Sequence, residues 1–439
     1  SFYWNLPNEN FSFLGYGEIF SLSESDFKSS PMLEKKFHNL PFKIVSNRSP
    51  EIELRHPQFV GGIKFPSGKS EQLWKNFDFA KWFIPKILLL KLNKEYFITI
   101  NEFYRMDVRR TLCRSRYGPY GEFSEERMTD GNFLSEVELI LESGSNSKNI
   151  SPLKYEEQFS IKFIKPSCNL DQWSSRVEAA LQKITDGIAE KIVLARFDEI
   201  EFTAAPNILS ILKGLEENYG ECYTFAYKSE DSIFFGSSPE KLFKISNGFI
   251  ETVALAGSIQ RGISDEEDAL LENQLLMSKK NLAEQKNVLD FILERLSPLA
   301  LKISYDSKPA VKKLSNIQHL CTNIRAELTP AANIFSLLEK LHPTPAVCGL
   351  PAEDALKIIN ELEEFDRGLY SGVVGWFNLQ NAGEFAVGIR SAVLNEKTLR
   401  AYAGSGIVNG SESLSEFNET ELKLKPIISL FVNETVNQS

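Results

Sequence analysis

The chain has 439 residues, 42% of them hydrophobic and 25% charged, with a formal net charge of −10. This ordinary globular composition and this length predict one large α/β unit or two packed units. Because phosphate binding relies on clustered Lys and Arg, an acidic chain without a basic tract is not expected to bind nucleic acid. An anionic substrate would need cations supplied locally.

The cysteines and the hydropathy predict a cytoplasmic protein, or one in an organelle matrix. Five widely spaced cysteines without a CxxC pair favour free thiols in a reducing compartment. No signal peptide is evident, and the most apolar stretch, residues 83–92, is interrupted by Pro85, Lys86 and Lys91. It is far shorter than the ~20 residues needed to span a bilayer. We therefore expect no membrane partner.

Residues 1–160 are rich in aromatic residues and short apolar runs. Residues 82–92 and 96–100, separated by a polar turn, predict a hairpin. The polar run 143–151 is the best linker candidate. We expect residues 1–160 to form a strand-rich region packed onto the same fold as residues 161–435, which form the catalytic region.

Helical and strand periodicities are clearer after residue 170. Turn residues between the predicted strands imply antiparallel pairing, and the long helices between them imply an α+β layered fold. The predicted strands cover residues 191–202, 223–227, 233–235, 370–378, 384–394 and 398–408, and the predicted helices cover about 171–189, 265–297, 352–364 and 411–432.

One carboxylate falls on an apolar stripe of the helix predicted at 265–297. Glu284 shares this stripe with Met277, Val288 and Phe291. A carboxylate in such a place must be paired or must bind a cation. A buried salt bridge and a metal site therefore both explain Glu284.

The last predicted helix carries Glu416, Glu419 and Lys423 on one face, at spacing i, i+3 and i+7. A solvated charged face would explain this pattern. However, a Gly-Ser-Gly turn at 404–406 precedes the helix, and glycines there would let the backbone approach a ligand closely. The alternative for the glycines is a plain strand exit.

Four more residues have both a structural and a chemical interpretation. Arg390 alternates with small residues and would suit a carboxylate, although an exposed sheet face also admits arginine. Lys191 opens a strand on its core-facing side, or it is a surface lysine. Glu240 follows a turn, where it could start the next element. His319 alternates with apolar residues, as a core histidine would.

A hard metal ion is the expected kind of metal. The four histidines have no HxxxH or HxH spacing, which argues against zinc, and separated carboxylates favour Mg²⁺. The sequence contains no Walker A motif, nucleophile elbow or dinucleotide fingerprint.

Taken in order, seven runs resemble the chorismate-utilising enzymes, a family that includes anthranilate synthase large subunits and isochorismate synthases. The resemblance spans about residues 170–430. The runs are KIVLAR (191–196), GSSPE (236–240), LAGS (255–258), HPTPAVCG (342–349), FDRGLYSGVVGW (365–376), GIRSA (388–392) and AGSGIVNGSESLSEFNETELKLK (403–425).

The resemblance implies one large sandwich of two antiparallel β-sheets with helices packed outside. It implies Mg²⁺ held by Glu284 and Glu419, with Glu416 nearby. It also implies that Arg390, Lys423 and the backbone around Gly404 hold the enolpyruvyl carboxylate of the substrate, chorismate. The residues implied around the ring are Gly257, Ser258, His319, Thr344, Ala346 and Tyr370.

Within the family the chain most resembles menaquinone-specific isochorismate synthases, which are isomerases. Members that add water carry a lysine at the position of Lys191, so no glutamine amidotransferase subunit is expected. In the implied mechanism, Lys191 takes a proton from the water that attacks ring carbon 2, and Glu240 protonates the hydroxyl leaving carbon 4. The rival is salicylate synthase, which usually has threonine at the position of Ala346. A non-catalytic binding subunit is the alternative of another class.

Overall fold

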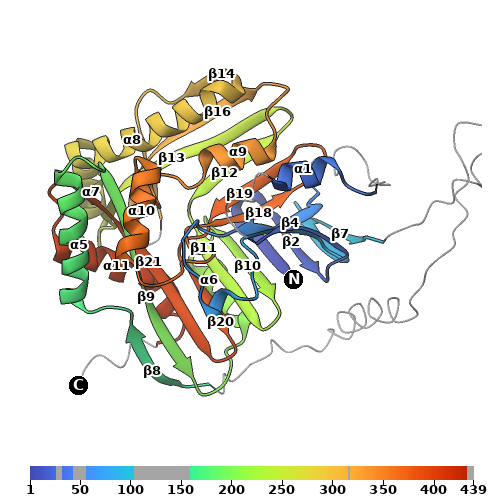
Figure 1. Ribbon diagram of the computed structural model, residues 1–439, viewed down its shortest axis with the longest axis horizontal. Helices are drawn as coiled ribbons and strands as arrows, with labels where there is room; N and C mark the ends of the chain where they lie inside the picture. The colour runs from blue at the N-terminus through green and yellow to red at the C-terminus, as the bar shows by residue number, and fades with distance from the viewer. Residues whose placement is uncertain (26–31, 43–55, 103–158, 315–316, 433–439) are drawn as a thin grey trace, which may run out of the picture. The chain divides into compact units, whose positions relative to one another are not determined.

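The structure is a computed structural model that describes residues 1–25, 32–42, 56–102, 159–314 and 317–432 (Figure 1). Two large sheets organise these residues, and every pairing between the described strands is antiparallel. The predicted linker at 143–151 lies outside the described residues, as does Cys113. The other four cysteines are free thiols and are buried.

The first sheet has eleven strands in the described part of the chain. Its order along the sheet is β17 (Gly349–Leu350), β9 (Lys191–Phe202), β21 (Thr398–Val408), β20 (Ser391–Asn395), β11 (Ser232–Ser238), β10 (Tyr223–Ser229), β1 (Phe2–Leu6), β2 (Phe11–Tyr16), β6 (Ile87–Leu92) and β7 (Glu95–Ile100), with β8 (Ile161–Pro166) also paired to β9.

The second sheet has ten strands in the same described ranges. Its order is β14 (Ala300–Tyr305), β16 (Ile317–Leu328), β13 (Phe249–Gln260), β12 (Lys241–Ser246), β19 (Gly383–Val387), β18 (Val373–Phe377), β4 (Phe59–Ile63), β5 (Ala80–Ile84) and β3 (Phe20–Glu24), with β15 (Ala310–Lys313) also paired to β16.

Helices cover the outer faces of both sheets, as Figure 1 shows for α8 beside β13 and for α5 and α10 beside β9. None of the described helices combines the length and hydropathy needed to cross a membrane. The helices are α1 (Met32–His38), α5 (Leu170–Thr185), α6 (Ile208–Asn218), α7 (Asp265–Met277), α8 (Lys279–Leu296), α9 (Ile334–Leu341), α10 (Ala352–Leu362) and α11 (Ser413–Ile428).

Alternation along the strands creates separate apolar cores. On β18, for example, Val374 and Trp376 belong to the core shared with the first sheet, whereas Val373 and Phe377 belong to the core covered by α8 and α9. Successive side chains of a strand point to opposite faces, so a strand that is buried on both faces contributes apolar side chains to two cores. The prediction of an α+β sandwich of two antiparallel sheets with helices outside is confirmed.

Strands from the beginning of the chain extend both sheets. β1 pairs with β10 in the first sheet, and β4 pairs with β18 in the second. The ladders therefore join residues 1–100 to residues 159–432 within each sheet.

The predicted strand over 82–92 is wrong as a single element. Residues 82–84 belong to β5 in the second sheet, whereas β6 starts at Ile87 in the first sheet. Pro85 lies between them, and proline cannot donate a ladder hydrogen bond. The rest of the predicted hairpin is confirmed, because β6 pairs with β7.

The predicted helix over 265–297 is two helices. Ser278 has extended backbone dihedrals (φ −71°, ψ 110°), ends α7, and accepts a hydrogen bond from the backbone N–H of Asn281 as the N-cap of α8. Serine is a favoured N-cap because its hydroxyl satisfies a free N–H group of the first turn. Met277 is consequently 79% exposed and does not share the stripe of Val288 and Phe291, which are buried.

Two predictions near the C-terminus also need correction. Residues 384–394 form two strands in different sheets, β19 and β20, so Arg390 does not alternate along one continuous strand. Residues 404–406 lie inside β21 and are not a turn. The strands predicted at 191–202 and 398–408 are confirmed with the same bounds.

A buried ion pair is hydrogen-bonded to the backbone of β9. Arg367 and Glu363 are 0% and 2% exposed; Arg367 donates to the backbone oxygens of Val193 and Val347, and Glu363 accepts from the backbone N–H of Ala195 (2.7 Å). The pair therefore joins β9 to the segment that contains Val347.

Glu363→Ala is expected to lower the free energy of unfolding by about 3–5 kcal/mol, because it leaves Arg367 buried and unpaired. Urea denaturation measures this change. Glu364→Ala is the matched control, since that side chain is 88% exposed and 3.5 Å from Arg176, where ion pairs contribute little. Equal destabilisation by both variants would contradict the assignment.

Candidate active site

One cavity of about 280 Å³ collects nearly all the residues that the sequence singles out. It is lined by β9, β13, β16, β21, α8 and α11, and by the loops after β11, α9, α10 and β19. All the predicted site residues except Thr344 line it, namely Lys191, Glu240, Gly257, Ser258, Glu284, His319, Ala346, Tyr370, Arg390, Gly404, Glu416, Glu419 and Lys423.

Lys191 is the first residue of β9 and is 3% exposed. Its Nζ donates to Oε1 of Glu284 on α8 at 2.7 Å, which pairs two residues 93 positions apart in the sequence. Of the two interpretations of Lys191, the core-facing one therefore agrees with the structure. The salt bridge that was one explanation of Glu284 is present, but it is only partly buried, because the Glu284 side chain is 26% exposed.

Gly406 leaves the space that Lys191 occupies. A Cβ atom at this position would lie 2.6 Å from Cε and 3.2 Å from Nζ of Lys191. Real Cβ atoms do not approach other atoms this closely, so a side chain here would displace the lysine.

Because the sequence predicts that Lys191 is a reacting group, and small displacements of such a group are costly, Gly406→Ala is expected to reduce turnover by up to about 10²-fold. The fold should persist, since the atoms in the way belong to the end of a flexible side chain. Steady-state kinetics and thermal unfolding test both statements. Gly68→Ala is the control, because its nearest neighbour would be Asn360 Nδ2 at 3.8 Å. Normal turnover in Gly406→Ala would show that the position of Lys191 is not critical.

Glu240 is a buried carboxyl with few hydrogen bonds. It is 8% exposed, and Thr344 Oγ1 donates to its Oε1 at 3.3 Å. Burial raises the pKa of Glu240 to about 7, while the hydrogen bond from Thr344 and the charge of Lys191 act in the opposite direction. The carboxyl is therefore still largely protonated at pH values where an exposed glutamate is ionised.

Thr344 lies behind Glu240 and does not line the cavity. Its backbone oxygen accepts from the N–H groups of Val347 and Cys348, at 3.1 and 3.0 Å. These hydrogen bonds fix the position of Thr344, which in turn holds the carboxyl group of Glu240 by its hydroxyl.

Arg390 lies between β19 and β20, where the chain passes from one sheet to the other. Its φ is +50°, a left-handed conformation that is uncommon for a non-glycine residue and often occurs at functional sites. The side chain is 9% exposed, and within the described ranges no hydrogen bond or ion pair engages its guanidinium. A buried guanidinium without an anionic partner is a strong candidate for binding a carboxylate.

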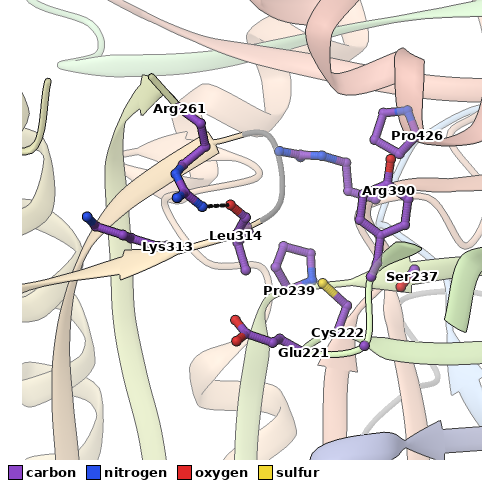
Figure 2. A pocket seen from close by; sticks show the side chains of 11 residues that line it. Glu221, Cys222, Ser237, Pro239, Arg261, Lys313, Leu314, Arg390 and Pro426 are labelled. Carbon is purple, nitrogen blue, oxygen red and sulfur yellow. Dashed lines mark hydrogen bonds between the residues drawn. The ribbon is translucent and has the colours of Figure 1, made fainter. Parts of the chain in front are cut away.

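Figure 2 shows Arg390 from a second cavity of about 320 Å³, together with Pro239, Ser237 and Cys222. Arg390 and Pro239 line both cavities. Burial lowers the pKa of Arg390, whereas the nearby groups on both sides, such as Cys222 and Glu419, favour its charged form. Arg390 therefore lies at the boundary between the cavities.

The three predicted metal ligands, Glu284, Glu416 and Glu419, each accept a hydrogen bond from a lysine or serine side chain. Glu419 accepts from Lys423 at 2.5 Å, and Glu416 accepts from Ser405 at 2.5 Å. Burial would raise the pKa of Glu419, but the adjacent Lys423 ammonium holds it below its usual value. No group of three or more His, Cys, Asp or Glu side chains is arranged to hold a metal ion in the described part of the chain.

The opposite wall is formed by β13 and β16. The ladder between them shifts register at Gly257, whose φ is +75°, and a Cβ there would lie 3.0 Å from Asn281 on α8. A glycine is needed at such a bulge and close approach. Next to it, Ser258 Oγ and His319 Nδ1 are 2.8 Å apart. Burial and nearby cations hold the pKa of His319 well below its ordinary value, so the imidazole is neutral.

Several cavity residues were missed by the sequence reasoning. Lys280 and Asn281 come from the first turn of α8, and Ser415 comes from the first turn of α11. Ser371 and Tyr402 also line the cavity, and Ser371 has a φ of +60°. Lys280 could have been found if the helix break at Ser278 had been predicted. A continuous helix over 265–297 has no N-terminus near Lys280, whereas the break places Lys280 in the first turn of α8.

Named relatives and solved structures resemble this chain over most of its length. Isochorismate synthase MenF of Bacillus subtilis is 31% identical over 439 residues, covering 99% of this chain and 88% of that protein. Anthranilate synthase component 1 of Saccharolobus solfataricus is 34% identical over 272 residues, covering 62% of this chain and 64% of that protein.

The structure of the menaquinone-specific isochorismate synthase MenF from Escherichia coli matches with a TM-score of 0.76 and 23% identity, covering 98% of this chain and 88% of that one. Anthranilate synthase component I from Streptococcus pneumoniae matches with a TM-score of 0.69 and 20% identity, over 96% and 92% of the two chains. At such identities the likeness shows a shared fold. The family model described as chorismate binding enzyme matches residues 1–432, and the chain therefore belongs to the chorismate binding enzymes.

Proposed function

We propose that the protein is an isochorismate synthase, an isomerase that moves the hydroxyl of chorismate from ring carbon 4 to ring carbon 2. The observation that carries the proposal is that a buried lysine, Lys191, and a buried carboxylic acid, Glu240, line the same cavity. The relatives named isochorismate synthase support the same activity.

The proposed reaction is an acid–base substitution with allylic shift. Lys191, as the neutral amine, takes a proton from water as the oxygen bonds to carbon 2, the ring double bonds move, and the bond from carbon 4 to its hydroxyl breaks. Glu240 donates a proton to the departing hydroxyl, which leaves as water. Because the same two groups can exchange roles, the reaction is expected to be reversible.

The resting contact between Lys191 and Glu284 bears on this mechanism. Glu284 Oε1 accepts from Nζ of Lys191 at 2.7 Å, and a cation bound by Glu284 in the reacting complex would replace this contact and leave Nζ to face the attacking water.

We assign Arg390, Lys423 and the backbone at Gly404 to the enolpyruvyl carboxylate of the substrate. Lys423 already donates to the backbone oxygen of Gly404 at 2.9 Å, and Arg390 is buried without an anionic partner among the described residues. The ring would lie against Gly257, Ser258, His319, Ala346 and Tyr370, which line the cavity. Thr344 would act through Glu240.

The carboxylates of the cavity have the chemistry that Mg²⁺ prefers, although they are not gathered into one cluster in this structure. Glu284, Glu416 and Glu419 offer carboxylate oxygens, the ligands that this hard ion prefers, and none of the four described cysteines lines the cavity. We propose that Glu284 and Glu419 hold the ion, with Glu416 nearby, in place of their contacts with Lys191 and Lys423. A bound Mg²⁺ would neutralise the ring carboxylate.

Glu419→Gln is expected to raise the Mg²⁺ concentration needed for half-maximal activity by about 10-fold or more, as loss of a charged ligand does. Mn²⁺ binding followed by electron paramagnetic resonance tests the site independently of turnover. Glu412→Gln, an exposed change near the start of α11, is the control. An unchanged metal requirement in Glu419→Gln would reject the assignment.

Chromatography of the products tests the function directly. Purified protein incubated with chorismate and Mg²⁺, without ammonia or glutamine, is expected to form isochorismate. Anthranilate as the main product, or no product, would reject the proposal. Salicylate with equimolar pyruvate would favour salicylate synthase, although Ala346 argues for isochorismate as the end product. Two relatives are named MenF, as is the menaquinone-specific isochorismate synthase of Escherichia coli, and this favours supply of menaquinone synthesis as the pathway role.

A further inference from the structure

The side chains that line the cavity carry a small positive formal charge. Its lining contains four cations, Lys191, Lys280, Arg390 and Lys423, and three carboxylates, Glu284, Glu416 and Glu419, besides Glu240, which is largely protonated below pH 7. The balance is one positive charge in a protein whose net charge is −10. Removing any of the four cations would leave a neutral cavity.

Lys280 differs from the other three cations in its exposure. The side chains of Lys191 and Lys423 are 4% and 19% exposed and each donates to a carboxylate at 2.7 Å or less, and Arg390 is buried. The side chain of Lys280 is 56% exposed, and its Nζ lies 3.7 Å from Glu416 Oε1. It is therefore the cavity cation, among the described residues, that an incoming anion meets from solvent.

The backbone around Lys280 holds it at this place. Ser278 N-caps α8 and accepts hydrogen bonds from both the backbone N–H and the side-chain amide of Asn281, at 3.3 and 3.0 Å. Asn281 in turn packs against Gly257 at the bulge of β13. The first turn of α8 is thus fixed to the wall of the cavity, and its free N–H groups add a positive potential.

We propose that Lys280 captures the substrate at the mouth of the cavity by attracting a dicarboxylate dianion before Arg390 and the metal site bind it. This inference rests on the proposed function, because that function gives the substrate two carboxylates. Charged groups that line a cleft raise the local concentration of an oppositely charged substrate and its association rate. Lys280 thus affects capture and leaves the chemical step unchanged.

Lys280→Gln is expected to raise KM for chorismate about tenfold, with kcat within about twofold of the parent protein. The rise should shrink as NaCl is increased from 0.02 to 0.5 M, because the Debye length falls from about 20 Å to about 4 Å. Lys279→Gln is the matched control: it removes the same charge from the adjacent exposed residue, which does not line the cavity. Lys280→Arg should restore the parent KM.

Three outcomes would overturn the proposal. An unchanged KM in Lys280→Gln would remove Lys280 from substrate capture, and an equal rise in Lys279→Gln would show a general effect of surface charge. A changed Mg²⁺ requirement without a salt-dependent KM would instead show that Lys280 only positions Glu416. Failure of the proposed function is distinguishable, because the parent protein would then make no isochorismate.

Discussion

Lys191→Gln is expected to reduce the turnover of chorismate by about 10²–10⁴-fold, the range contributed by a positioned general base. Glutamine keeps much of the length of lysine and can still donate a hydrogen bond to Glu284, but it cannot accept the proton of the attacking water. Lys191 is 3% exposed, so few other groups can reach the same place. Steady-state kinetics with product chromatography measure the loss.

Two further measurements separate loss of the base from damage to the rest of the site. Substrate affinity, measured by equilibrium titration, and the Mg²⁺ requirement should both remain within a few-fold of the parent protein. Lys183→Gln is the control, since that lysine lies on α5 at 3.5 Å from Glu361, with a side chain 37% exposed. Near-normal turnover in Lys191→Gln would remove Lys191 as the base.

Sequence reasoning located best the elements in which the periodicity of apolar residues and the flanking turn residues indicate the same boundaries. β21 pairs with β9 along its full predicted length, from Lys191 opposite Val408 to Glu201 opposite Thr398. Local breaks were less predictable. The change of sheet between β19 and β20 occurs at Arg390, a positive-φ residue that is not glycine. Short-range patterns carry little information about such a conformation, because tertiary packing maintains it.

The members of the site were predictable from the order of motifs, but their contacts were not. Lys191 and Glu284 are 93 positions apart, and Thr344 and Glu240 are 104 positions apart. Their pairing depends on how the two sheets and α8 pack together, which periodicity along one segment does not encode. Lys280 was missed for a local reason, because the break at Ser278 that starts α8 was not predicted.

Glu240→Gln is expected to reduce turnover by about 10²–10⁴-fold, because the amide cannot protonate the departing hydroxyl. The fold should be retained, since glutamine is nearly isosteric with a carboxyl that is already largely protonated, and burial is the reason for that protonation. Glu240→Asp should keep part of the activity, because it retains the acid but withdraws it by one methylene. Glu251→Gln, with a side chain 49% exposed, is the control.

The pH dependence gives an independent test of the same role. Burial raises the pKa of Glu240 to about 7, and the reaction needs its protonated form. In the parent protein kcat/KM should therefore fall as pH rises through about 7, since this ratio reports the free enzyme. Thr344→Val removes a hydrogen bond that lowers the pKa of Glu240, so the falling limb should move to higher pH. A limb that stays in place in Thr344→Val, or persists unchanged in Glu240→Asp, would show that another group titrates there.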